Sequence, residues 1–214
     1  MFTIRTSASL LAAALAAAFA ALAPAAWAAG EHQHHHDQHQ HQHQHAEVPP
    51  GYARQVAQYQ IPPTALLRAD GAKAQFPQAI DDGRPVVLNF IYTSCTAICP
   101  ILSHSFAEFQ RQLGAEREQV HMVSISIDPE EDTPRRLSEY AARFEAGRQW
   151  SFFTGSAVAS VSLQKAFQAY YGGKMHHRPA TFLRAAPGEP WVRLDGFTSP
   201  DELMAEYRRL VHRH

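Results

Sequence analysis

The amino-acid sequence predicts an α/β domain with a central mixed sheet flanked by helices. Residues 85–92 and 120–127 form almost continuous apolar runs, which is typical of central strands that are covered on both faces. Stretches with one apolar face and a capping residue at their start follow these runs, so strands and helices alternate along the chain. This alternation predicts a sheet with helices on both of its sides.

The order of the elements gives the domain a thioredoxin-like layout. The expected strands span about 85–92, 120–127, 150–153, 181–185 and 191–195. The expected helices span about 100–113, 133–146, 156–170 and 199–212. Thr133 and Ser199 suit the cap positions of two of these helices, and Pro134 suits the first turn. An Asp70-Gly71 turn signal before the first strand predicts a small N-terminal hairpin addition.

Three zones divide the chain. Residues 1–29 are predicted to be a secretory signal, because Arg5 precedes a short apolar stretch and Ala26-Trp27-Ala28 offers a cleavage site. An uncleaved N-terminal anchor is the alternative. Residues 30–47 are a His-rich tract too polar to bury a core, and residues 48–214 are the folded domain. The expected location is periplasmic, either soluble or tethered to the outer face of the inner membrane.

Composition excludes some classes of function. The chain has 214 residues, 45% of them apolar, which is enough for one domain with a real core. Its formal net charge is −1 with histidine neutral, so there is no basic field to attract nucleic acid or acidic lipids. Nucleic acid is therefore not an expected partner.

The two cysteines, Cys95 and Cys99, lie where a central strand passes into a helix. A disulfide between them would close a very short loop and would stabilise the fold little, so chemistry is the better explanation. The N–H groups at a helix start favour thiolates, and four-residue spacing places both side chains on one helical face. If the first turn is unwound, the two could instead come close enough for a disulfide, so such a site can hold a metal or store an oxidised pair. Two soft thiolates favour Cu(I) or zinc, and a closed zinc site needs four ligands. From the residues alone, copper binding and pure thiol chemistry both stay open.

Three motifs then point to one family. Residues 89–100 read NFIYTSCTAICP, residues 123–134 read VSISIDPEEDTP and residues 150–155 read WSFFTG. In this order they resemble the Sco/SenC family of copper proteins for cytochrome c oxidase assembly, over about residues 61–210. The resemblance implies a thioredoxin-like fold and a copper site formed by Cys95, Cys99 and a histidine before a late strand. The family's spacing to Leu183 identifies that histidine as His177 and leaves His176 as the less favoured neighbour.

The resemblance also implies a function and its partners. The protein is expected to hold Cu(I), with Cu(II) as the other oxidation state, and to deliver it to the dinuclear centre in the copper-accepting subunit of cytochrome c oxidase. Such a metallochaperone is not an enzyme in the usual sense. A thioredoxin-like reductant is a further expected partner.

Two alternative functions would use the same two cysteines. A periplasmic thiol-disulfide oxidoreductase would use Cys95 to attack and Cys99 to resolve, reducing the cysteines of the copper acceptor. Pro179 favours this alternative, because thioredoxins place a cis proline at the corresponding strand start. A copper or redox sensor is the other alternative.

Several other polar residues are candidates for lesser roles. Asp128 is either a turn residue or a carboxylate near the cysteines. The remaining histidines of the domain, His104, His121, His212 and His214, are expected to be ordinary surface or partly buried residues. The eight histidines of the His-rich tract are predicted to bind Cu(II), Ni(II) or zinc weakly at several sites.

Overall fold

The computed structural model describes residues 51–212. The predicted signal and the His-rich tract lie outside the described residues, as do residues 48–50 and 213–214 of the predicted domain. The strands are β1 (Tyr52–Ala57), β2 (Thr64–Arg68), β3 (Lys73–Phe76), β4 (Val86–Ile91), β5 (His121–Ser126), β6 (Trp150–Thr154), β7 (Ala180–Arg184) and β8 (Trp191–Gly196). The helices are α1 (Ile98–Leu113), α2 (Pro134–Arg143), α3 (Ala157–Ala166) and α4 (Pro200–Val211), with short 3-10 turns η1 (Gln78–Ile80), η2 (Gly114–Gln119) and η3 (Lys174–His176).

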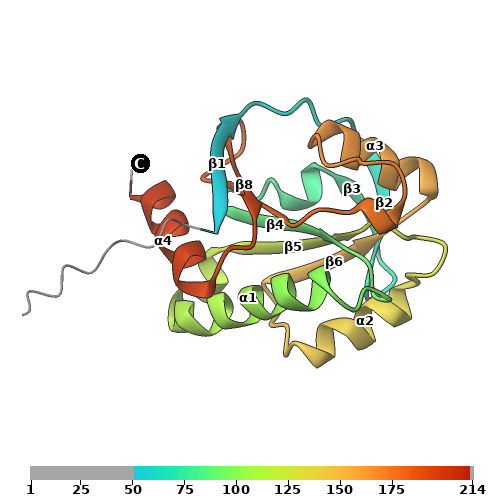
Figure 1. Cartoon of the computed structure of the whole chain (residues 1–214), viewed down its shortest axis with the longest axis horizontal. Helices are drawn as coiled ribbons and strands as arrows, with labels where there is room; N and C mark the ends of the chain where they lie inside the picture. The colour runs from blue at the N-terminus through green and yellow to red at the C-terminus, as the bar shows by residue number, and fades with distance from the viewer. Residues whose placement is uncertain (1–50, 213–214) are drawn as a thin grey trace, which may run out of the picture. The chain divides into compact units, whose positions relative to one another are not determined.

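All eight strands join one mixed sheet in the order β1-β8-β7-β4-β5-β6-β2-β3 (Figure 1). The strands β4, β5 and β6 run parallel, whereas the other pairings are antiparallel. The predicted central mixed sheet is therefore confirmed. The buried runs predicted as central strands are β4 and β5, at the middle of the sheet.

Helices cover both faces of the sheet, and β4 has apolar side chains on each of its two sides to pack against them. One core contains side chains of α1, α2 and α4 together with Val87 and Ile91 of β4. The other core contains side chains of α3 and of the β2–β3 hairpin together with Leu88 and Phe90. Figure 1 shows α1, α2 and α4 on one side of the sheet and α3 on the other. This layered packing holds the C-terminal end of β4, where the cysteines follow.

Local sequence signals set several element boundaries. The Thr133 hydroxyl caps α2, and Ser199 forms a reciprocal capping box with Glu202 at the start of α4. Helices α2 and α3 end a few residues earlier than the sequence predicts. Glu145 and Gln168 follow them with φ values of 51° and 54°, and this left-handed backbone stops a helix.

The N-terminal additions were predicted only in part. The β2–β3 hairpin turns at Asp70-Gly71 as expected, with Gly71 at a φ of 85°. Strand β1 was not predicted, because its residues are mostly exposed and lack an apolar alternation. It is held at the sheet edge by β8 and by Glu206 of α4, which accepts a hydrogen bond of 2.8 Å from Arg54.

Candidate metal centre

The two cysteines meet at the start of α1. The chain leaves β4, and the N–H of Cys95 bonds to the carbonyl of Tyr92 at 3.2 Å, which turns the backbone toward the helix. Helix α1 begins at Ile98, two residues before the predicted start, so Cys99 lies in its first turn. The Cys99 N–H donates to the Sγ of Cys95 at 3.3 Å. Both residues are buried free thiols, and the structure therefore brings these two predicted site residues together.

The two thiols differ in their acidity. Burial raises the pKa of the Cys95 thiol, but the N–H groups of Cys99 and Ala97, the Cys99 thiol and the Tyr92 hydroxyl together lower it below its ordinary value. Burial raises the pKa of the Cys99 thiol far above its ordinary value, and the neighbouring charges of Cys95 and Asp132 add to this. Cys95 is thus the thiol that ionises first.

His177 lies close to this pair but does not contact it directly. Its Nε2 bonds to the carbonyl of Phe90 at 3.0 Å, so this nitrogen carries a proton and donates it. The ring packs edge-on against Tyr92, with 6.4 Å between the ring centroids. The Tyr92 hydroxyl in turn interacts with Cys95, and burial followed by this interaction raises the pKa of Tyr92 to about 12. One aromatic ring thus contacts both the histidine and the cysteine.

The imidazole of His177 is in the form that binds metals. Burial lowers its pKa below the ordinary 6.5, and the Phe90 carbonyl opposes this only in part. The ring is therefore neutral at neutral pH. Within residues 51–212, however, no three histidine, cysteine, aspartate or glutamate side chains converge closely enough to hold a metal ion. Two of the three predicted ligands, Cys95 and Cys99, lie together, and His177 does not converge with them in this structure.

The neighbours of His177 bear on the alternatives. His176 is exposed on η3 and contacts none of the site residues through a hydrogen bond among the described side chains. Pro179 follows a trans peptide bond, since the one cis peptide between residues 51 and 212 precedes Pro77. The cis proline of thioredoxins is therefore not reproduced at this position.

Acidic residues after β5 complete the surroundings of the site. Asp128 is buried, its carbonyl accepts from the Asp132 N–H at 2.8 Å, and its carboxylate pairs with Lys174 at 2.5 Å. It is thus a turn residue, and its carboxylate pairs with Lys174, on the segment before His177. Asp132 is fully buried and accepts hydrogen bonds of 2.6 Å from the Thr93 and Ser126 hydroxyls.

Sequence reasoning did not single out Asp132, Tyr92 or Lys174. The first two occur inside the motifs at residues 123–134 and 89–100, which is the signal that could have found them. No sequence pattern marks Lys174.

The other histidines stay outside the site. His104 is exposed on α1, and His212 lies at the end of α4. His121 is buried at the start of β5, with its Nε2 3.2 Å from the Ser151 hydroxyl. His214 lies outside the described residues.

Comparison with known proteins identifies the family. The family model described as SCO1/SenC matches residues 62–212, well over half of the chain. The chain belongs to the SCO1/SenC family. The resemblance carried by the three motifs is thereby confirmed, and the match includes every residue of the candidate site.

Relatives of this SCO1/SenC chain include the SCO1 protein homolog of Bacillus subtilis, which is 30% identical over 104 residues. That alignment covers 48% of this chain and 53% of the relative, so the match spans about half the length of the curated protein. Two solved structures share the fold. ScoI of Arabidopsis thaliana with copper bound is 24% identical, with a TM-score of 0.61 over 72% of this chain and 98% of that one. BsSco, a member of the Sco family of cytochrome c oxidase assembly proteins with a disulfide switch, is 24% identical, with a TM-score of 0.62 over 76% and 99%.

These structures confirm the thioredoxin-like fold class predicted from the sequence. A further structural relative, from Bacillus anthracis, is a SCO1/SenC family lipoprotein (23% identity, TM-score 0.62, 73% of this chain and 97% of that one). In the part of this chain that the structure describes, no helix combines the length and the apolar character needed to span a bilayer.

Proposed function

We propose that this protein binds Cu(I) through Cys95, Cys99 and His177 and delivers it to the dinuclear copper centre of cytochrome c oxidase. The observation that carries the proposal is the pair of free thiols at the start of α1, joined by the contact between the Cys99 N–H and the Cys95 sulfur. Family membership and the copper-bound relatives support copper as the cargo. The work would take place at the periplasmic face of the inner membrane, where the predicted signal directs the chain.

The donor set suits Cu(I) chemically. Thiolate sulfur and imidazole nitrogen are ligands that soft Cu(I) prefers, and hard cations would leave such a set for oxygen. Cys95 ionises readily, whereas Cys99 needs the metal itself to displace its proton, so binding releases protons. An acceptor protein with its own thiolates can then take the cargo by replacing these ligands one at a time.

The third ligand is the part of the proposal that a measurement must decide. X-ray absorption at the copper edge on anaerobically reduced, copper-loaded protein reports the neighbouring atoms. We expect two sulfur atoms and one nitrogen in the wild type and in His176→Ala, whose side chain is exposed and serves as the matched control. In His177→Ala the nitrogen is expected to disappear. A nitrogen neighbour that persists in His177→Ala, or that is lost equally in His176→Ala, would refute the assignment.

A second candidate function is favoured by the unequal thiols. The more acidic Cys95 can attack a disulfide of the copper acceptor, and the sulfur–sulfur bond of that disulfide then breaks to leave a mixed disulfide and one thiolate. Attack by Cys99 releases the second acceptor thiol and leaves a Cys95–Cys99 disulfide, which a thioredoxin-like reductant must reduce. His177→Ala distinguishes the two functions. Copper delivery should collapse in this variant, whereas disulfide exchange should continue at nearly the wild-type rate.

A further inference from the structure

The segment that carries His177 is tied to the end of β5 by an ion pair. We use the name histidine segment for residues 172–178. Lys174, the first residue of η3, places its Nζ 2.5 Å from an Oδ of Asp128. The backbone N–H of His177 bonds to the Lys174 carbonyl at 3.1 Å, so the position of Lys174 constrains the backbone at His177.

Asp128 is a rigid anchor for this pair. Its side chain is 10% exposed. Its N–H bonds to the Ser126 hydroxyl at 3.0 Å, and its carbonyl accepts from the N–H groups of Glu131 and Asp132. The backbone of Asp128 is therefore held on both sides, so we expect the pair to restrain the lysine more than the aspartate.

The histidine segment has few other attachments. Gly172 has a φ of 94°, and a Cβ added at Gly172 or Gly173 would meet nothing within 4 Å, so the segment is entered through an open glycine pair. Met175 is 79% exposed. Among the described residues, two side-chain hydrogen bonds tie the histidine segment to other elements, Lys174 to Asp128 and His177 to the Phe90 carbonyl.

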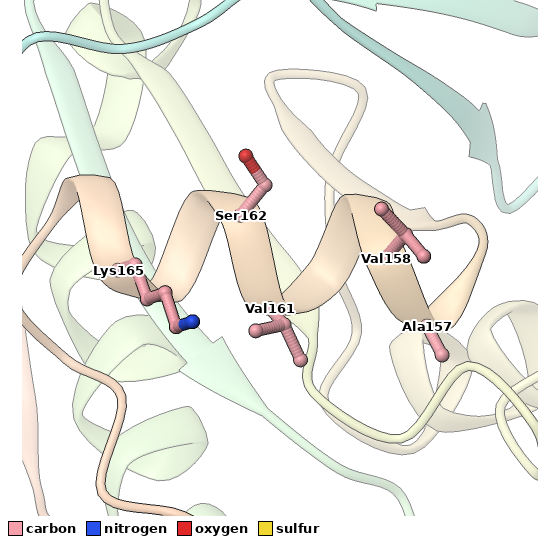
Figure 2. Close-up of a pocket in the computed structure, with 5 residues that line it drawn as sticks. All are labelled: Ala157, Val158, Val161, Ser162 and Lys165. Carbon is pink, nitrogen blue, oxygen red and sulfur yellow. The ribbon is translucent and has the colours of Figure 1, made fainter.

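The surroundings offer Lys174 no competing partner from α3. A cavity of about 220 Å³ opens beside the ion pair and is lined on its helical side by Ala157, Ser160 and Val161. Figure 2 shows a different pocket on α3, whose lining includes Ala157, Val158 and Val161 and, farther along the same helix, Lys165. Lys165 lies over the Tyr170 ring at 5.3 Å and does not line this cavity. Lys165 is thus an exposed lysine that forms no hydrogen bond or ion pair with the described residues of the histidine segment.

We propose that Lys174 is a positioning residue, whose ion pair with Asp128 holds the histidine segment where His177 bonds to Phe90 and faces Tyr92. Breaking the pair frees the ring to reach the cysteines. While Nε2 donates to Phe90, the unprotonated Nδ1 is the nitrogen that can bind copper, so the ion pair acts by controlling how often the histidine segment opens and lets the ring approach the cysteines. This role rests on the proposed copper function, and it concerns the step before the metal is held.

The first test needs no copper. Amide hydrogen exchange of His176 and His177 in reduced, copper-free protein reports the opening of η3, because these N–H groups bond to Gly173 and Lys174. In Lys174→Gln we expect exchange at both amides to be roughly two- to fivefold faster, as for loss of a partly exposed ion pair. Lys174→Arg keeps the charge and should restore the wild-type rate, and Lys165→Gln should leave it unchanged. Equal exchange in all four proteins would overturn the proposal.

The second test measures the rate of Cu(I) uptake from a weak chelator in the same proteins. We expect Lys174→Gln to take up copper faster by a similar factor, with Lys174→Arg and Lys165→Gln at the wild-type rate. If exchange quickens but uptake does not, the link to the third ligand is wrong. If the wild type binds no Cu(I) at all while exchange behaves as expected, the copper function fails and the positioning of the histidine segment stands.

Discussion

Replacing Asp132 by asparagine tests how the cysteine loop is held in place. Asp132 lies between β5 and α2 and is fully buried. One oxygen accepts from the Thr93 hydroxyl at 2.6 Å, the other accepts from the Ser126 hydroxyl at 2.6 Å, and the Thr93 N–H lies 3.2 Å from both. Thr93 stands two positions before Cys95, so this network fixes the backbone from which the cysteine loop departs.

The expected loss of stability follows from these contacts. Asparagine keeps one carbonyl oxygen, which can retain the bonds from Thr93, but its NH₂ group faces the Ser126 hydroxyl and loses that charged hydrogen bond. One such bond contributes about 1.5–3 kcal/mol, so Asp132→Asn should lower the free energy of unfolding by about 2 kcal/mol. Alanine leaves all the donors without a partner, and Asp132→Ala should cost about 4 kcal/mol.

Urea denaturation of the reduced, copper-free protein at neutral pH, followed by tryptophan fluorescence, measures this loss. Glu131→Gln is the matched control, because Glu131 precedes Asp132 in the chain but forms an exposed ion pair with Arg136. We expect this control to change the free energy of unfolding by less than about 0.5 kcal/mol. A loss in Asp132→Asn no larger than in Glu131→Gln would show that the buried network does not hold the loop.

Two further predictions concern histidines outside the candidate centre. Burial, with help from Arg84 and against Asp82, holds the pKa of His121 below its ordinary 6.5, so the unfolded chain binds more protons as the pH falls below that value. The contribution of the neutral ring to the free energy of unfolding is complete above pH 6.5 and is lost at up to about 1.4 kcal/mol per pH unit below it. Between pH 7.5 and 5.5, the free energy of unfolding should therefore fall less steeply in His121→Asn than in the wild type. An equal dependence on pH in the two proteins would contradict this. Removing residues 31–46 takes away eight of the 14 histidines, and Cu(II) titration should show fewer bound equivalents than in the full chain, whereas equal stoichiometry would dispose of metal binding by the tract.

The sequence predicted the parts of the fold that depend on local signals. The apolar runs of β4 and β5, the Thr133 and Ser199 caps and the Asp70-Gly71 turn all act within a few residues. Strand β1 could not be predicted in this way. Its side chains are mostly exposed, and its tether to Glu206 reaches across 152 positions from Arg54. An edge strand held by distant partners leaves no periodic pattern to detect.

The candidate site likewise has one part that depends on local sequence and one part that depends on distant residues. Cys95 and Cys99 meet where a buried strand passes into a helix, as the sequence predicts, but Cys95 lies before α1, so the contact joins the Cys99 N–H to the Cys95 sulfur and not two side chains on one helical face. The position of the His177 ring depends on the Phe90 carbonyl, 87 positions earlier in the chain. Family resemblance could name the histidine, but only the fold could show that Tyr92 contacts both it and Cys95.

In the proposed copper function, the fold would prearrange the three ligands unequally. The two thiols already lie together in one short loop, whereas the His177 ring is anchored by the bond from its Nε2–H to the Phe90 carbonyl. While Nε2 donates this bond, the unprotonated Nδ1 is the nitrogen that would bind the metal. When an acceptor thiolate replaced the imidazole, the ring would still have this hydrogen-bonded position inside the fold. A third ligand with such a position would favour release over permanent storage.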